Sequence, residues 1–242
     1  MAGKAVARSG RAGRAAGRKI NARDALLQAA GELMNERDTL EISLGEISSR
    51  AKVNSALVKY YFGNKKGLML ALLERDVGKS MAQLSHLVES DVGPIEKLRI
   101  HIAGLINLYY RSRYLNKLLF MLLRDTTPDE ALLISDRLLK PAADAQGRIL
   151  EEGVALGVFR EVDPMLFYFS IIGSCDQLFT ASFALKTVFG QNEVDDAMRR
   201  RFVEHTTALL IAGITRHAPN EPAPRFVGRG GMVPTAGRRF NA

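Results

Sequence analysis

Residues 43–73 read SLGEISSRAKVNSALVKYYFGNKKGLMLALL and carry the start signals of successive helices. Ser43, with Glu46 three positions later, matches a capping box, in which each side chain binds the backbone N–H of the other residue. After a turn at 51–53, Asn54 is a good cap for a second short helix. Apolar residues at helical spacing mark the inward faces, namely Leu44, Ile47 and Ala51, then Val58 and Phe62. The stretch therefore predicts two short helices joined by a tight turn, the layout of a helix-turn-helix unit.

The run 47–73 resembles the DNA-binding domain of the TetR family of bacterial repressors, through VNSALV at 53–58 and YYFGNKK at 60–66. In that family the second helix enters the major groove, and the aromatic residues at its end hold phosphates together with the following lysine. The resemblance implies that Ser55 and Lys59 face base edges. The implied contacts to the DNA backbone are Tyr60, Tyr61 and Lys65. At the start of the first helix, Ser43 and Gly45 are further expected DNA-binding residues.

Two positions depart from the family pattern. Lys52 stands where the turn usually has glycine, so it must either adopt a left-handed backbone conformation or alter the turn. Lys59 stands where the family commonly has tyrosine, and a lysine can donate to guanine O6 or N7 or to a phosphate. Taken without the resemblance, the two helices would fit an ordinary packed hairpin as well as a DNA-binding unit.

Positive charge is concentrated at the two ends of the chain. Residues 1–23 carry +7 with no acidic residue and residues 218–242 carry +3, so a total of +8 leaves about −2 for the body. A segment of Gly, Ala and Arg buries too little apolar surface to offset its ordering entropy, which predicts a disordered basic arm at 1–19 and a flexible basic tail at 218–242. The arm could order along DNA phosphates. The alternative is a solubilising segment or a wrongly assigned start. A targeting peptide is not favoured, because the segment has neither an apolar stretch of signal-peptide length nor an amphipathic helix.

The remaining sequence predicts an all-α protein, with the DNA-binding domain at 20–66 and a larger effector-binding and dimerisation domain at 67–217. Asn21 with Asp24 predicts the cap of the first helix. From Pro94 onward the apolar repeat is helical throughout, and Pro141 should kink or split the helix that begins near Asp129. Gly153 to Pro164 resembles, more loosely, the segment that precedes the last two helices in the family. Those two helices are expected here at 164–186 and 193–217.

The first of these two helices has apolar groups on more than one face, which indicates an extra packing partner. These groups are Phe167, Phe169, Ile171, Ile172, Phe179 and Phe183. In the family the two helices form a four-helix bundle with their copies, so the resemblance implies a homodimer; a fully buried helix of a monomer is the alternative. Two reading helices roughly 34 Å apart would select a palindrome.

Family members enclose a small-molecule effector among their middle helices, and a pocket needs only a few polar groups to orient its ligand. The candidate groups, polar or semi-polar residues in apolar helices, are His101, Asn107, Tyr110, Tyr114, Cys175 and Gln177, with Tyr109 beside them. The surrounding Leu and Phe residues favour an apolar or amphipathic effector over a sugar phosphate.

Several classes of function lack their signals. A single cysteine and four scattered histidines argue against internal disulfides and zinc clusters, and no apolar run reaches membrane-spanning length. The sequence has no phosphate loop, nucleophile elbow or metal-binding helix motif, so it predicts neither an enzyme nor a cofactor. We therefore expect a cytoplasmic transcriptional regulator, a repressor of palindromic operators released by its effector. The alternative is a sequence-nonspecific nucleic-acid-binding protein that uses only its basic tails; repression as against activation is left open.

Overall fold

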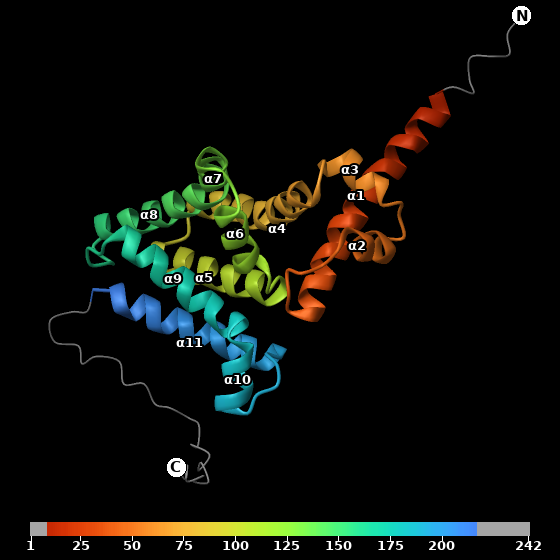
Figure 1. Ribbon diagram of the computed structural model, residues 1–242. Helices are drawn as coiled ribbons and strands as arrows, with labels where there is room; N and C mark the ends of the chain where they lie inside the picture. The colour runs from red at the N-terminus through yellow and green to blue at the C-terminus, as the bar shows by residue number, and fades with distance from the viewer. Residues whose placement is uncertain (1–8, 217–242) are drawn as a thin grey trace, which may run out of the picture.

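The structure, a computed structural model, is helical and describes residues 9–216, with side chains placed from residue 22 onward (Figure 1). The helices are α1 (Ser9–Arg37), α2 (Leu44–Ala51), α3 (Ala56–Phe62), α4 (Lys65–Val88), α5 (Pro94–Arg111), α6 (Leu115–Arg124), α7 (Pro128–Ile134), the π-helical turn η1 (Ser135–Leu139), α8 (Lys140–Ala155), α9 (Pro164–Thr180), α10 (Ser182–Phe189) and α11 (Asp196–Ile214). Between residues 9 and 216 there is no β-strand, only an isolated antiparallel bridge between Phe159 and Thr215. The all-α prediction is confirmed.

The N-terminal helices α1 to α3 and the start of α4 form a small helix-turn-helix domain at one end of the molecule (Figure 1). Its core consists of fully buried apolar side chains from all four helices, including Leu26, Leu33, Ile47, Val58 and Leu68. These positions follow the helical spacing of the sequence, because each short helix can bury only one face.

Helix α1 begins at Ser9, earlier than the sequence suggested. Residues 9–19 of the expected disordered arm are thus helical, and Asn21 lies inside the helix instead of capping it. Ala, Arg and Lys are good helix formers, and extending an existing helix avoids the unfavourable nucleation step. The expected arm at residues 1–8 and the expected tail at 218–242 lie outside the described residues.

Helix α4 leads from the small domain into a C-terminal helical domain arranged around α5 (Figure 1). α5 packs against α4, α8, α9 and α11, and most of its apolar residues are buried. Pro94 occupies the first turn of α5, where its missing N–H leaves no hydrogen bond unmade. The segment 112–114 then separates α5 from α6.

The helix that begins at Pro128 is divided, as Pro141 predicted. α7 ends at Ile134, the π-helical turn η1 follows, and Pro141 lies in the first turn of α8. Proline has no backbone N–H to donate to the carbonyl four residues earlier, and its ring clashes with that carbonyl. The wider π-helical turn before Pro141 makes room for the ring where this hydrogen bond is missing.

The last two helices have bounds that the sequence did not predict. The expected helix at 164–186 is broken at Ala181 into α9 and α10, and the expected helix at 193–217 begins only at Asp196. At the break, the Ser182 hydroxyl donates to Asp38 at 3.1 Å, a contact far away in sequence. Asp195 caps α11 by accepting from the Met198 N–H. Residue 217 lies outside the described part of the chain.

Candidate DNA-binding surface and effector cavity

The first helix of the helix-turn-helix is held by the cap that its sequence predicts. Ser43 and Glu46 form the capping box of α2, each accepting from the other's backbone N–H. Lys52 adopts the left-handed conformation at φ 55° and ψ 41°, and its N–H donates to the carbonyl groups of Ser48 and Ser49. The N-cap of α3 is Ser55, which makes no side-chain cap bond; the predicted cap, Asn54, lies one residue earlier and accepts from the Ala56 N–H at 2.8 Å. The departure at Lys52 therefore preserves the turn.

Ion pairs fix α2 onto α1. Arg37 lies 2.6 Å from Glu46, and Arg50 binds both carboxylate oxygens of Glu36 at 2.8 Å. The hydrogen bond from Arg37, followed by those from Ser43, lowers the pKa of Glu46 to about 2. The carboxylate that caps α2 consequently stays ionised at neutral pH.

One face of α3 points away from the core. Val58 is buried, while Ser55, Lys59 and Tyr60 are exposed, and Tyr60 has 65% of its surface accessible. Tyr61 is half-buried and meets the Tyr60 ring edge-on at 4.9 Å. Phe62, expected inward, is half-buried with the guanidinium group of Arg23 over its ring. Ser43 and Gly45 are exposed at the start of α2, although the Ser43 hydroxyl is engaged in the cap.

The start of α4 completes this surface. Asn64 caps the helix by accepting from the Gly67 N–H at 2.9 Å, which leaves Lys65 exposed in the first turn. Gly67 is required here, because a Cβ would overlap the Phe62 carbonyl oxygen. Lys66 differs from its neighbour, since it binds Glu130 at 2.8 Å and Thr126 at 2.8 Å. The candidate DNA-binding residues Ser55, Lys59, Tyr60, Tyr61 and Lys65 form a surface that we call the DNA-facing surface.

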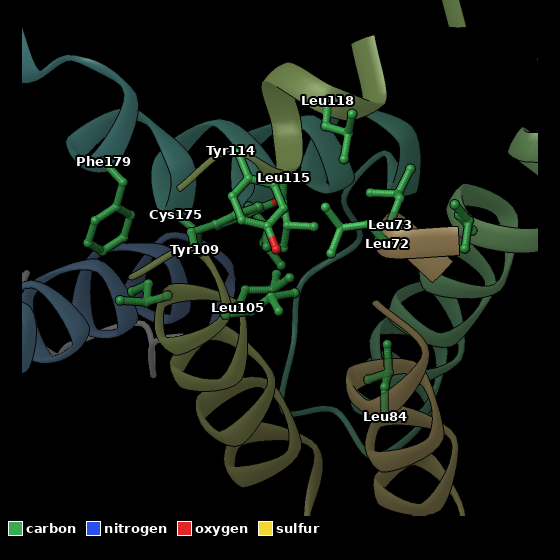
Figure 2. Close-up of a cluster of buried hydrophobic side chains, with 14 of the residues drawn as sticks. Leu72, Leu73, Leu84, Leu105, Tyr109, Tyr114, Leu115, Leu118, Cys175 and Phe179 are labelled. Carbon is green, nitrogen blue, oxygen red and sulfur yellow. The ribbon is translucent and has the colours of Figure 1, made fainter. Parts of the chain in front are cut away.

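The C-terminal domain contains an apolar cavity of about 510 Å³ walled by α4, α5, α6, η1, α8 and α9. Figure 2 shows part of the buried cluster beside it, where Leu73, Leu105, Tyr109 and Leu115 come together. The apolar lining includes Leu73, Val77, Met81, Leu105, Leu108, Leu115, Leu119, Phe120, Leu123, Leu138, Phe169 and Ile172. A cavity with these walls favours a ligand that is mainly hydrocarbon.

A few polar groups interrupt these walls. Asn116 and Tyr109 are both buried, and the Tyr109 hydroxyl lies 3.5 Å from the Asn116 amide oxygen. Tyr168 contributes a half-buried hydroxyl from α9. Asp136 and Lys140 line the cavity but are exposed, so they lie toward solvent. The buried polar pair is placed to orient a ligand inside the cavity.

None of the six candidate ligand residues from the sequence lines this cavity. His101 faces a separate pocket of about 430 Å³ between α4 and α5, and its Nε2 lies 2.8 Å from the Gln146 amide nitrogen. Burial lowers the pKa of His101 to about 4, so the ring is neutral at pH 7. Cys175 is buried in the core, and burial raises the pKa of its thiol to about 12.

The other candidates are dispersed. Arg199 of α11 donates to Asn107 and lies over the Tyr110 ring, so both residues belong to the α5–α11 contact. Gln177 is exposed, and Tyr114 lies at the junction between the two domains. Sequence reasoning overlooked Asn116, although Asn116, Leu119, Phe120 and Leu123 recur at helical spacing and thereby mark one face of α6.

Two negative findings apply to residues 9–216. None of the helices there is long and apolar enough to cross a membrane. Histidine, cysteine and acidic side chains in the same range form no cluster of three or more that could hold a metal ion.

Several solved structures share the fold. A TetR/AcrR-family transcriptional regulator from Thermobifida fusca is 20% identical, covers 79% of this chain and 97% of its own, and has a TM-score of 0.60. FadR from Bacillus subtilis, in complex with stearoyl-CoA, is 20% identical over 81% of this chain and 98% of its own, with a TM-score of 0.60. AibR, in complex with isovaleryl coenzyme A and operator DNA, is 20% identical, covers 78% of this chain and 98% of its own, and also has a TM-score of 0.60. Curated protein sequences gave no match.

Family models match both domains. Residues 26–72 match that of the tetR family of bacterial regulatory proteins, and residues 91–220, more than half of the chain, match that of the tetracyclin repressor-like C-terminal domain. Both matches coincide with the helix-turn-helix and the cavity-bearing domain described above. The chain therefore belongs to the TetR family of bacterial regulatory proteins.

Proposed function

We propose that this protein represses transcription by binding palindromic operators as a homodimer. The observation that carries the proposal is the DNA-facing surface, in which Ser55 at the start of α3 and Lys59 and Tyr60 within it are exposed. A rigid helix with polar side chains on its outer face can enter the major groove. Ser55 and Lys59 would read base edges, and Tyr60 and Tyr61 would contact the sugar-phosphate backbone.

The start of α4 suits a backbone phosphate. Its first backbone N–H groups point toward the end of the helix, and the exposed ammonium group of Lys65 lies in that first turn. A helix N-terminus and an adjacent lysine together attract an anion without reading sequence. This phosphate contact would fix the register of α3 in the groove.

Dimerisation would use the exposed faces of α9 and α11. On α9, Leu166 is 60% and Phe169 is 65% exposed, and they share one stripe with exposed Gly173. A Cβ at Gly173 would have no neighbour within 4 Å, so the glycine leaves room for a close partner. On α11 the exposed residues Ala208 and Leu209 are likewise small or apolar. Pairing these faces in a second copy would bury apolar surface that is costly to expose.

The effector would be an apolar or amphipathic molecule that enters the 510 Å³ cavity and hydrogen-bonds to Asn116 or Tyr109. An acyl chain fits such walls, and the structurally similar FadR from Bacillus subtilis and AibR were solved with acyl-CoA ligands. If the effector favours a conformation in which the two α3 helices are wrongly spaced, DNA and effector weaken each other by the same factor. Such a regulator would act in the cytoplasm.

Selection of binding sites from random duplexes tests this function. The full-length protein should enrich a palindrome, and Lys59→Ala should change the enriched bases while retaining duplex binding. Removal of residues 1–18 should lower affinity and preserve the preferred sequence. Enrichment of no sequence, or complete loss of binding without residues 1–18, would favour the nonspecific tail-dependent binder instead.

A further inference from the structure

A buried tyrosine joins the two domains. Tyr114, between α5 and α6, is only 4% exposed, and its hydroxyl donates to the Asp76 carboxylate of α4. The same hydroxyl abuts α1, because a Cβ on Gly31 would lie 2.7 Å from it. Burial, followed by the contact with Asp76, raises the pKa of Tyr114 well above its usual range, so the hydroxyl remains a donor. One hydroxyl group thus contacts a helix of the DNA-binding domain and the connecting helix α4.

Helix α1 also holds the backbone on either side of this tyrosine. The Asn35 amide nitrogen donates to the Arg111 carbonyl at 2.7 Å, and its oxygen accepts from the Arg113 N–H at 3.0 Å. One turn further on, Lys117 donates to Asp38, just past the end of α1, at 2.7 Å. Residues 111–117, which we call the joint, are therefore tied to the DNA-binding domain by side chains at three points.

The joint forms part of the wall of the effector cavity. Leu115 and Asn116 follow Tyr114 directly, and both line the cavity. Figure 2 shows Tyr114 and Leu115 in the buried cluster. A ligand that displaces the start of α6 must move Tyr114, because the two are consecutive in a tightly packed segment.

We propose that the joint transmits cavity occupancy to the DNA-binding domain, with Tyr114 as the positioning residue whose bond to Asp76 sets the angle of α1 and α4. This inference rests on the proposed function, since it connects the DNA-facing surface with the effector cavity. Breaking the bond leaves Asp76 still paired with Arg75 at 2.7 Å, so no carboxylate is left without a partner. Opening the bond therefore leaves only the buried Tyr114 hydroxyl to find a new acceptor, a cost that a ligand-driven shift of α6 would have to offset.

Hydrogen–deuterium exchange with the selected operator tests the inference without the effector, because linkage lets DNA report the same coupling in reverse. Operator binding should slow amide exchange across residues 112–119 about fivefold in the wild type, the effect of one hydrogen bond. In Tyr114→Phe, which keeps the buried ring, the slowing should fall below about twofold while the operator remains bound. Tyr168→Phe is the matched control, since it removes a cavity-wall hydroxyl that lies on α9, and it should keep the full response.

A second pair of variants separates this role from a merely structural one. Asp76→Asn keeps an oxygen acceptor for Tyr114 and should retain the exchange response, whereas Asp76→Ala should lose it. A wild-type response in Tyr114→Phe, or equal losses in Tyr114→Phe and Tyr168→Phe, would overturn the inference and leave the DNA-binding function intact. Failure of the wild type to bind any selected duplex would overturn the proposed function, and the inference with it.

Discussion

Two adjacent lysines at the start of α4 have different partners and so different expected roles in DNA binding. Lys65 is exposed, whereas Lys66 is bound to Glu130 and Thr126. We expect Lys65→Ala to weaken binding to all duplexes alike and to reduce the slope of log K against log salt by about one unit. Titrations at several salt concentrations measure the slope. Lys66→Ala is the control and should leave it unchanged; equal slopes for the two variants would exclude Lys65 as the phosphate contact.

The buried imidazole of His101 predicts a pH dependence of stability. Its pKa is about 4 in the folded protein against 6.5 for the free side chain, so the unfolded chain binds an additional proton between these values. Stability should be unaffected by His101 above pH 6.5 and should fall as the pH drops toward 4, by roughly 3 kcal/mol in total. Urea unfolding across this range, compared with His101→Gln, measures the contribution. Parallel pH profiles for both proteins would contradict it.

Single residues also show the limits of sequence reasoning about the cavity. His101, Cys175 and Gln177 are polar or semi-polar residues in apolar helices, yet they lie in a separate pocket, in the core and on the surface respectively. Which face of a helix meets a cavity depends on the packing of several helices, which spacing along one helix does not fix. The outward face of α3, with Ser55, Lys59 and Tyr60 exposed, was easier to predict, because the apolar spacing within one short helix determines which side is buried.

At the scale of elements, the turn between α2 and α3 is strained at Lys52. A left-handed conformation costs a residue with a Cβ roughly 1 kcal/mol, a penalty that glycine avoids. Lys52→Gly should therefore raise the free energy of unfolding by about 0.5–1 kcal/mol in urea denaturation. Lys59→Gly, at another exposed lysine but inside α3, should instead lower it by about 1 kcal/mol. Destabilisation by Lys52→Gly would show that the lysine side chain stabilises the turn.

Element boundaries were predictable where local chemistry sets them. Caps and prolines act within one turn of helix, and each lies where a helix begins or is divided. The caps are Ser43 and Asn64, and the prolines are Pro94 and Pro141. The break at Ala181 has no proline or glycine, and it coincides with the contact between Ser182 and Asp38, 144 residues apart. Such a contact depends on the assembled fold, so the local sequence gave no signal.

At the scale of the whole molecule, Gly173 offers a direct test of the proposed dimer. A Cβ at this position would meet no atom within 4 Å in the protomer, and we expect a larger side chain there to obstruct a partner helix. Gly173→Leu should preserve the fold, produce monomers in sedimentation velocity and weaken operator binding. Gly78→Leu is the matched control, since Gly78 is an exposed helical glycine of α4 with equal free space. A dimeric Gly173→Leu protein would place the interface elsewhere.

The central claim is that two copies present their α3 helices to successive major grooves of one palindrome. Its most direct test is the affinity for the selected operator after insertion of about five base pairs, half a helical turn, between the half-sites. The account predicts that this insertion places the half-sites on opposite faces of the duplex and reduces affinity to that for unrelated DNA. Undiminished affinity for the lengthened site would contradict paired reading by a rigid dimer.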